Sequence, residues 1–348
     1  MDAPTGTHVA LDLDVLAGLM RDDGLEVAPP LTAERVGRGQ SNLTYRVGDA
    51  HGRSWIVRRP PLGQLLASAH DVLREHRILT ALAGTGVPVP AVVGRYVEEA
   101  LADTPVVVME HVEGLVVDRL DVAEGLTSGV RAEIGLALAR TLAEVHRVDV
   151  DAVGLGDLGP RSPYAARQIK RWSRQWDASR TREAPRLEAL TELLRRAMPE
   201  QHEIALVHGD FHLLNTIVDP ESGSVRAVLD WELSTLGDPL ADVGSLLAYW
   251  PQADDGPAML FAASTMPGFA SRERLVAAYL EASGRSRAEL GYWHVLGLWK
   301  VAIIAEGIVR RTSADARNAA EGGPPTTAQI DLLIERAWAV AEAARLGP

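Results

Sequence analysis

Asp210, Asn215 and Asp230 have the side-chain types and spacing of a site for phosphate chemistry. Asp210 and Asn215 are five residues apart in HGDFHLLN, and Asp230 in VLDWE closes the hairpin that the short runs TIV and VRAVLD predict. One short unit of chain can therefore direct all three side chains to a common point. Two carboxylates and an amide oxygen are hard ligands that suit Mg²⁺, and a remaining carboxylate can accept a proton from a hydroxyl. We predict that these three residues catalyse phosphoryl transfer from a nucleotide.

The segment HGDFHLLN followed by VLDWE resembles the catalytic loop and metal-binding segment of the aminoglycoside phosphotransferase and choline kinase family, which has a protein-kinase-like fold. The resemblance implies that Asp210 is the catalytic base, that Asn215 binds Mg²⁺, and that Asp230 binds Mg²⁺ as the counterpart of the Asp in the protein-kinase DFG motif. It also implies ATP or another nucleoside triphosphate as the donor and a hydroxyl of a small molecule as the acceptor. The alternative is a plain hairpin with capping residues.

Three further polar residues are predicted to support this loop. His208, directly before Gly-Asp, is expected to brace the turn through backbone hydrogen bonds. In GDPLADVG, Asp238 and Asp242 are expected to cap a helix and to fix the catalytic loop.

The elements that must position these residues predict an α+β fold of two lobes. Residues 1–111 contain two β-rich runs around the turn GDAHG, a helical pattern over 68–83 and the apolar run VVVM, which together predict a small β-rich nucleotide-binding lobe with one main helix. Residues 112–348 are mostly helical apart from the hairpin, and predict a larger catalytic and substrate-binding lobe.

Glu75 is expected to need a cation from the same lobe. It shares the apolar face of the 68–83 helix with Val72 and Leu79, and a buried carboxylate requires a charge partner. In kinase-like folds a lysine at the position of Arg58 pairs with this glutamate and touches the nucleotide phosphates. No lysine precedes residue 170, so we predict Arg58 in this role, with Arg59 on the opposite strand face as the alternative.

The turn VGRGQSNLTYRV stands where kinase-like folds place a loop over the phosphates. Gly37 and Gly39 would let the backbone approach a phosphate, and Ser41 and Asn42 could add donors. An ordinary hairpin turn is the alternative.

The run VVVMEHVEG resembles the connection between the two lobes, where the nucleotide base is bound through backbone groups. Glu110 and Val112 are the residues predicted for these contacts.

Composition excludes several classes of protein. The chain of 348 residues has no cysteine, a net charge of −12 and a pI near 5.3, which rule out disulfides and thiolate chemistry and argue against nucleic-acid binding. No apolar run approaches the length of a membrane span and no secretion signal opens the chain, so a cytoplasmic location is expected. The oligomeric state cannot be read from the sequence.

The acceptor is left open by the sequence. WIVRRPPLG and HVLGLWKVAIIAEGIVRR resemble the branch of the family whose kinase-like domain is fused to some acyl-CoA dehydrogenases, which implies a hydroxyacyl compound or another metabolite. Residues 251–348 carry 11 acidic and 10 basic side chains, which is not the acid-rich pocket that a polycationic aminoglycoside needs. An aminoglycoside kinase and an inactive nucleotide-binding pseudokinase remain alternatives, whereas a metallophosphoesterase lacks its further metal-binding motifs.

Overall fold

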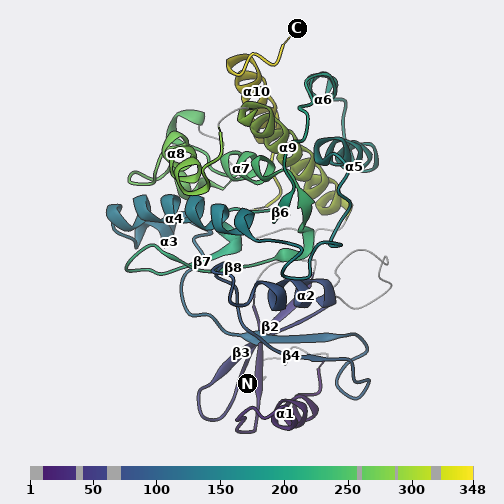
Figure 1. Ribbon diagram of the computed structural model, residues 1–348, viewed down its shortest axis with the longest axis vertical. Helices are drawn as coiled ribbons and strands as arrows, with labels where there is room; N and C mark the ends of the chain where they lie inside the picture. Colours follow the sequence, from purple (N-terminus) through teal and green to yellow (C-terminus); the bar gives the residue numbers. More distant parts are fainter. Residues whose placement is uncertain are drawn as a thin grey trace, which may run out of the picture. The chain divides into compact units, whose positions relative to one another are not determined.

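The protein is described by a computed structural model for residues 11–36, 42–60, 72–256, 261–286, 289–314 and 323–347 (Figure 1). The chain forms two compact units. The first comprises Met1–Ala83 with Val89–Glu113, and the second comprises Gly84–Pro88 with Gly114–Pro348.

The first unit is built on a five-stranded antiparallel sheet. Its strands follow the order β1-β2-β3-β5-β4, and they are β1 (Thr32–Arg35), β2 (Leu43–Gly48), β3 (Ser54–Arg59), β4 (Val92–Tyr96) and β5 (Val106–Glu110). β2 and β3 form the predicted hairpin, with Tyr45 opposite Val57. The side chain of Asp49 holds its turn by accepting hydrogen bonds from the backbone N–H groups of His51 and Arg53.

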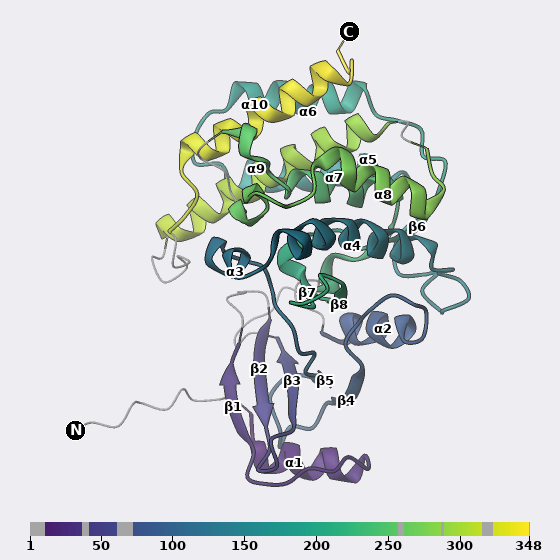
Figure 2. The same cartoon turned by 90° about the vertical axis from the view of Figure 1, so that its left-hand side faces the viewer.

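Two helices pack on this sheet. α1 (Leu13–Asp22) lies beside the strands of this sheet (Figure 2). Its fully buried Leu16 and Met20 belong to one apolar cluster with Val47 and Val57. α2 (Val72–Leu82) contacts β4 and β5, and Glu75 is among its buried residues. The predicted 68–83 helix is thus observed from Val72 to Leu82, and α1 adds a second helix to the one main helix expected from the sequence.

The second unit is mostly helical, as predicted. Its helices are α3 (Leu120–Glu124), α4 (Ser128–Arg147), α5 (Tyr164–Ser179), α6 (Pro185–Arg196), α7 (Pro239–Ala248), α8 (Arg272–Ser283), α9 (Leu290–Ala314) and α10 (Thr327–Ala343). Two short antiparallel pairs carry the segment between α6 and α7, namely β6 (Ala205–Val207) with β9 (Thr235–Gly237) and β7 (Thr216–Val218) with β8 (Val225–Val228). The second pair is the hairpin predicted from TIV and VRAVLD.

α7 and α9 approach each other at backbone contact in the centre of this unit (Figure 2). A Cβ atom added to Gly244 would lie 2.2 Å from the carbonyl oxygen of Trp293, and one added to Gly297 would lie 2.6 Å from the carbonyl oxygen of Gly244. Only glycine fits such an approach. The contact fixes the two helices that supply Asp242 and Lys300 to the site described below.

α9 has the length and composition of a membrane-spanning helix, unlike the expectation that no such segment exists. In the described part of the chain it is the one helix with this property, and 83% of its apolar window is buried inside the protein. Such burial is the pattern of a core helix.

Candidate active site

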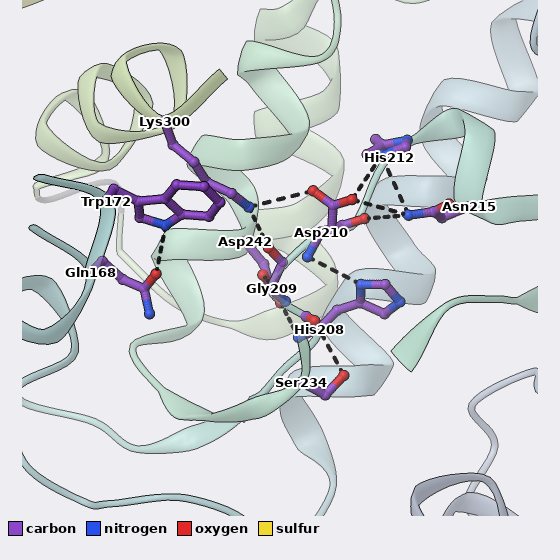
Figure 3. Close-up of polar contacts among 10 residues, drawn as sticks. All are labelled: Gln168, Trp172, His208, Gly209, Asp210, His212, Asn215, Ser234, Asp242 and Lys300. Atoms are coloured by element: carbon purple, nitrogen blue, oxygen red, sulfur yellow. Dashed lines mark hydrogen bonds and ion pairs between the residues drawn. The ribbon is translucent and has the colours of Figure 1, made fainter. Parts of the chain in front are cut away.

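The loop that carries Asp210 is held through its backbone by Asp242 of α7. One carboxylate oxygen of Asp242 accepts the His208 N–H at 2.6 Å, and the other accepts the Gly209 N–H at 2.9 Å (Figure 3). Gly209 has φ +82°, and a Cβ at this position would lie 2.7 Å from the Leu233 carbonyl oxygen. The predicted fixing of the loop by Asp242 is therefore observed, and glycine is required before Asp210.

Buried histidines complete this support. The His208 ring lies 2.9 Å from the Leu229 carbonyl oxygen through Nε2, and its Nδ1 accepts the Asp210 N–H at 3.3 Å, which is the bracing role predicted for it. His146 of α4 places Nε2 3.3 Å from Asp242 and Nδ1 2.8 Å from the Tyr279 hydroxyl. Burial lowers the pKa values of His146 and His208, so both rings are neutral near pH 7.

The Asp210 carboxylate has partners at both oxygens. Oδ1 lies 3.4 Å from Nζ of Lys300, while Oδ2 lies 3.2 Å from Nε2 of His212 and 3.4 Å from Nδ2 of Asn215 (Figure 3). Asn215 also donates to the Asp210 backbone carbonyl at 3.0 Å. The structure thus brings two of the predicted catalytic residues into direct contact.

Opposing effects set the pKa of Asp210. Burial alone would raise it, but Lys300 and His212 lower it to well below the ordinary carboxyl range. Asp210 is therefore a carboxylate at neutral pH, the form that can accept a proton. Bound phosphates would counteract the positive charge of Lys300 and raise the affinity of Asp210 for that proton.

Asp230 lies two residues after the end of β8, next to Leu229, which bonds to Asn215. The ladder pairs Thr216 with Val228, and the Leu229 N–H donates to the Asn215 carbonyl at 2.8 Å. Asp230 has a left-handed backbone conformation, with φ 64° and ψ 61°. For a non-glycine residue this conformation costs free energy and is enriched at functional sites.

The residues available for a metal ion fit Mg²⁺ that shares phosphate oxygens. The Asn215 amide nitrogen is engaged by Asp210, which leaves the amide oxygen for a cation, and the carboxylate of half-buried Asp230 could serve as a second hard oxygen ligand. Among the described residues no group of three or more His, Asp and Glu side chains could enclose a metal. Mg²⁺ accepts so few protein ligands because water and nucleotide oxygens complete its shell.

Lys300, His212 and Tyr249 are contacts of Asp210 that the sequence did not identify as site residues. The pKa of Tyr249 is raised well above its ordinary value by burial and by Asp210, and its ring centroid lies 4.3 Å from that of His212 and 4.8 Å from that of Phe261. A signal existed for Lys300, since it is one of two lysines in the chain and interrupts an apolar helix. No pattern linked it to a loop 90 residues earlier.

In the first unit, the choice between Arg58 and Arg59 is resolved by their partners. Arg58 forms an ion pair with Glu75, which is 3% exposed, whereas Arg59 is paired with Asp103. The predicted cation–glutamate pair is therefore Arg58–Glu75.

The other predicted nucleotide contacts are described in part. Gly37, Gly39 and Ser41 lie outside the described residues. Asn42 is buried, and its side-chain oxygen has no hydrogen-bond partner in the described portion of the chain. The Glu110 N–H donates to the Ala91 carbonyl at 2.8 Å, so this backbone group is already engaged, and half-buried Val112 follows the end of β5.

Residues 32–294 match the model of the phosphotransferase enzyme family known as APH. The chain belongs to this family. Over 236 residues it is 41% identical to acyl-CoA dehydrogenase family member 10 of Mus musculus, which covers 68% of this chain and 22% of that relative. The chain therefore spans about a fifth of this relative's length, and the predicted likeness to the acyl-CoA dehydrogenase branch of the family is confirmed.

Solved structures confirm the kinase-like fold of this phosphotransferase family member. A crystal structure of a Ralstonia eutropha protein, assigned provisionally as an aminoglycoside phosphotransferase, has 30% identity and a TM-score of 0.74, covering 96% of this chain and 97% of that one. The amicoumacin kinase hAmiN, in complex with AMP-PNP and Ca²⁺, has 14% identity and a TM-score of 0.58, covering 96% and 95% of the two chains. At this low identity, the similarity to amicoumacin kinase shows a shared fold and nothing further.

Proposed function

We propose that this protein transfers the γ-phosphoryl group of ATP to a hydroxyl of a small molecule. The observation that carries the proposal is the contact of Asp210 with Asn215 beside Asp230, on a loop held by Asp242. The acceptor oxygen attacks the γ-phosphorus, the bond from that phosphorus to the β–γ bridging oxygen breaks, ADP leaves, and the hydroxyl proton passes to the Asp210 carboxylate.

Asn215 and Asp230 would hold Mg²⁺ through their side-chain oxygens. When bound, Mg²⁺ neutralises charge on the nucleotide phosphates. Membership of the phosphotransferase family supports a nucleotide as the phosphate donor, and amicoumacin kinase, which shares the fold, is an example bound to AMP-PNP and Ca²⁺.

We infer that the first unit is the nucleotide-binding lobe and the second the catalytic and acceptor-binding lobe. Arg58, braced by Glu75, would bind phosphate in place of the usual lysine, because a guanidinium group can grip phosphate with two donors. The side chains of Asn42 and Ser41 would donate hydrogen bonds to the phosphates, and Gly37 and Gly39 would let the backbone approach them. The Glu110 carbonyl and the Val112 N–H would bind the base.

A hydroxyacyl compound or a similar metabolite is the acceptor we favour. The similarity to a member of the acyl-CoA dehydrogenase family supports it. The surroundings of Asp210 agree, because the aromatic rings of His212, Tyr249 and Phe261 cluster beside its carboxylate. The Ralstonia eutropha structure keeps an aminoglycoside kinase as the second candidate, although residues 251–348 carry nearly equal numbers of acidic and basic side chains.

The experiment that tests the proposal is a screen for ATP-dependent phosphorylation with Mg²⁺ present. The acceptors are hydroxylated acyl compounds, other hydroxylated metabolites and aminoglycosides, each assayed by ADP release and by mass increase of the acceptor. We expect a hydroxylated metabolite to be phosphorylated and aminoglycosides to be poor acceptors. Absence of both turnover and nucleotide binding would contradict the proposal, whereas nucleotide binding without transfer to any acceptor would favour the pseudokinase.

The same proposal includes a water-soluble protein acting in the cytoplasm, without a nucleic-acid or membrane partner. The net charge of −12 and the burial of most of α9 support this part.

A further inference from the structure

Lys300 is a buried cation on the apolar helix α9. Its residue is 7% exposed, and the positions on either side, Trp299 and Val301, belong to the core. An ammonium group buried in this way is costly unless partners compensate its charge. These partners are the Gly209 carbonyl oxygen at 2.5 Å, the Asp210 carboxylate at 3.4 Å and the face of the Trp172 ring at 5.5 Å from its centroid (Figure 3).

The two polar contacts of Lys300 fall on adjacent residues of the catalytic loop. The Gly209 N–H is bound by Asp242 of α7, and the Gly209 carbonyl is bound by Lys300 of α9, so this residue is held from both sides. α7 and α9 are themselves in backbone contact at Gly244 and Gly297. The loop is therefore attached at two points to one rigid pair of helices.

The contact with Asp210 completes the fixation of its carboxylate. Oδ2 is held by His212 and Asn215, and Lys300 holds Oδ1. Loss of Lys300 would leave the Oδ1 side without its cation, and the carboxylate could rotate about its last side-chain bond. A displacement of a reacting group by about 1 Å can cost about 10²-fold in rate.

The surroundings of Lys300 favour lysine over arginine, although nearly all basic residues of this chain are arginine. Of the 35 basic residues only Lys170 and Lys300 are lysine. The cavity that Lys300 shares with Tyr164, Gln168 and Trp172 has a volume of about 20 Å³, which is room for about one water molecule. A guanidinium group is larger and planar, so the compact ammonium group fits this place.

We propose that Lys300 is a positioning residue for phosphoryl transfer, whose ammonium group fixes the Gly209 carbonyl and the Asp210 carboxylate in the arrangement that the reaction uses. The inference rests on the proposed function. By this inference a residue of α9, which lies outside the catalytic segment 206–231, helps to orient the carboxylate of the base.

Lys300→Met tests the proposal because it keeps the length and apolar stem of the side chain and removes the charge. We expect kcat to fall about 10²-fold with an unchanged dissociation constant for Mg²⁺–ATP, measured by titration, in the intact chain and with the acceptor found in the screen. Lys170→Met is the matched control, since Lys170 is exposed, and should behave as the wild type. A wild-type kcat in Lys300→Met would overturn the proposal. So would a loss of nucleotide affinity as large as the loss of kcat, together with a lower melting temperature, because that result would indicate general damage to the fold.

A chemical rescue separates the ammonium group from the shape of the side chain. The chain contains no cysteine, so Lys300→Cys introduces a single thiol. Alkylation with 2-bromoethylamine in denaturant, followed by refolding, creates an ammonium group at nearly the length of lysine, and iodoacetamide creates a neutral adduct. We expect only the first adduct to regain kcat, with identically treated wild type as the control, and equal rescue by both would refute a role for the charge.

The Asp210→Asn variant distinguishes failure of this inference from failure of the proposed function. If Asp210→Asn loses transfer and Lys300→Met does not, only the role of Lys300 is wrong. If Asp210→Asn turns over like the wild type, the assignment of Asp210 as the base is wrong, and if the wild type transfers phosphate to no acceptor, the proposed function itself is wrong.

Discussion

Asp242→Asn should loosen the catalytic loop while changing no group that touches a substrate. The native carboxylate accepts two backbone N–H groups, from His208 at 2.6 Å and from Gly209 at 2.9 Å, and both bonds are buried. An asparagine side chain has one oxygen and one NH₂ group. In either orientation one of the two backbone N–H groups faces a donor instead of an acceptor.

The size of the effect follows from these two bonds. A hydrogen bond to a charged group contributes about 1.5–3 kcal/mol, and a buried donor left without an acceptor costs a similar amount. We therefore expect the free energy of unfolding to fall by about 3 kcal/mol. If the loosened loop raises the activation free energy of the reaction by the same amount, kcat should fall about 10²-fold.

Hydrogen exchange measures the loop directly. The amides of His208 and Gly209 should exchange much faster in Asp242→Asn than in the wild type, while urea unfolding reports the global change. Asp219→Asn is the matched control, because Asp219 also accepts two backbone N–H groups but in the exposed turn of the β7–β8 hairpin. Unchanged exchange at 208 and 209 in Asp242→Asn would refute the reasoning.

Three other variants test separate parts of the account. Arg58→Met removes the Arg58 ion pair from buried Glu75, so unfolding should become easier, by up to about 3–5 kcal/mol; if urea unfolding is unchanged, the pair does not stabilise the first unit. Asp230→Ala should raise the Mg²⁺ concentration needed for half-maximal activity, and an identical magnesium titration would remove Asp230 as a ligand. His294 has its pKa lowered from 6.5 to about 3 by burial and two arginines, so the stability linked to it is present above pH 6.5 and is lost as the pH falls toward 3. Relative to His294→Gln, the wild type should lose about 1.4 kcal/mol between neutral pH and about pH 5.5, and parallel unfolding curves of the two against pH would contradict this.

The parts of the site that sequence predicted are those encoded locally. Asp210, Asn215 and Asp230 lie in one short segment, in which the loop brings Asp210 and Asn215 into contact and the hairpin pairs the strand after Asn215 with the strand before Asp230. The Arg58–Glu75 pair was predictable for a similar reason, because helix spacing places Glu75 on the apolar face. Strand alternation left Arg59 as an alternative, which only its ion pair with Asp103 resolves.

The missed parts depend on tertiary packing. Lys300 reaches Gly209 across 91 residues of sequence, and that contact requires α9 to meet α7 at Gly244 and Gly297. A glycine in an apolar helix does not reveal which backbone it will touch. His146 is likewise one of many polar residues on a helix until α7 places Asp242 beside it.

The most direct test of the central claim is the rate of phosphoryl transfer from Mg²⁺–ATP to the acceptor in Asp210→Asn, measured beside its affinity for nucleotide. The amide keeps the shape of the side chain but cannot accept the hydroxyl proton as the carboxylate does. We predict a fall in kcat of at least about 10²-fold with nucleotide affinity retained. Transfer at the wild-type rate in this variant would contradict the assignment of Asp210 as the base.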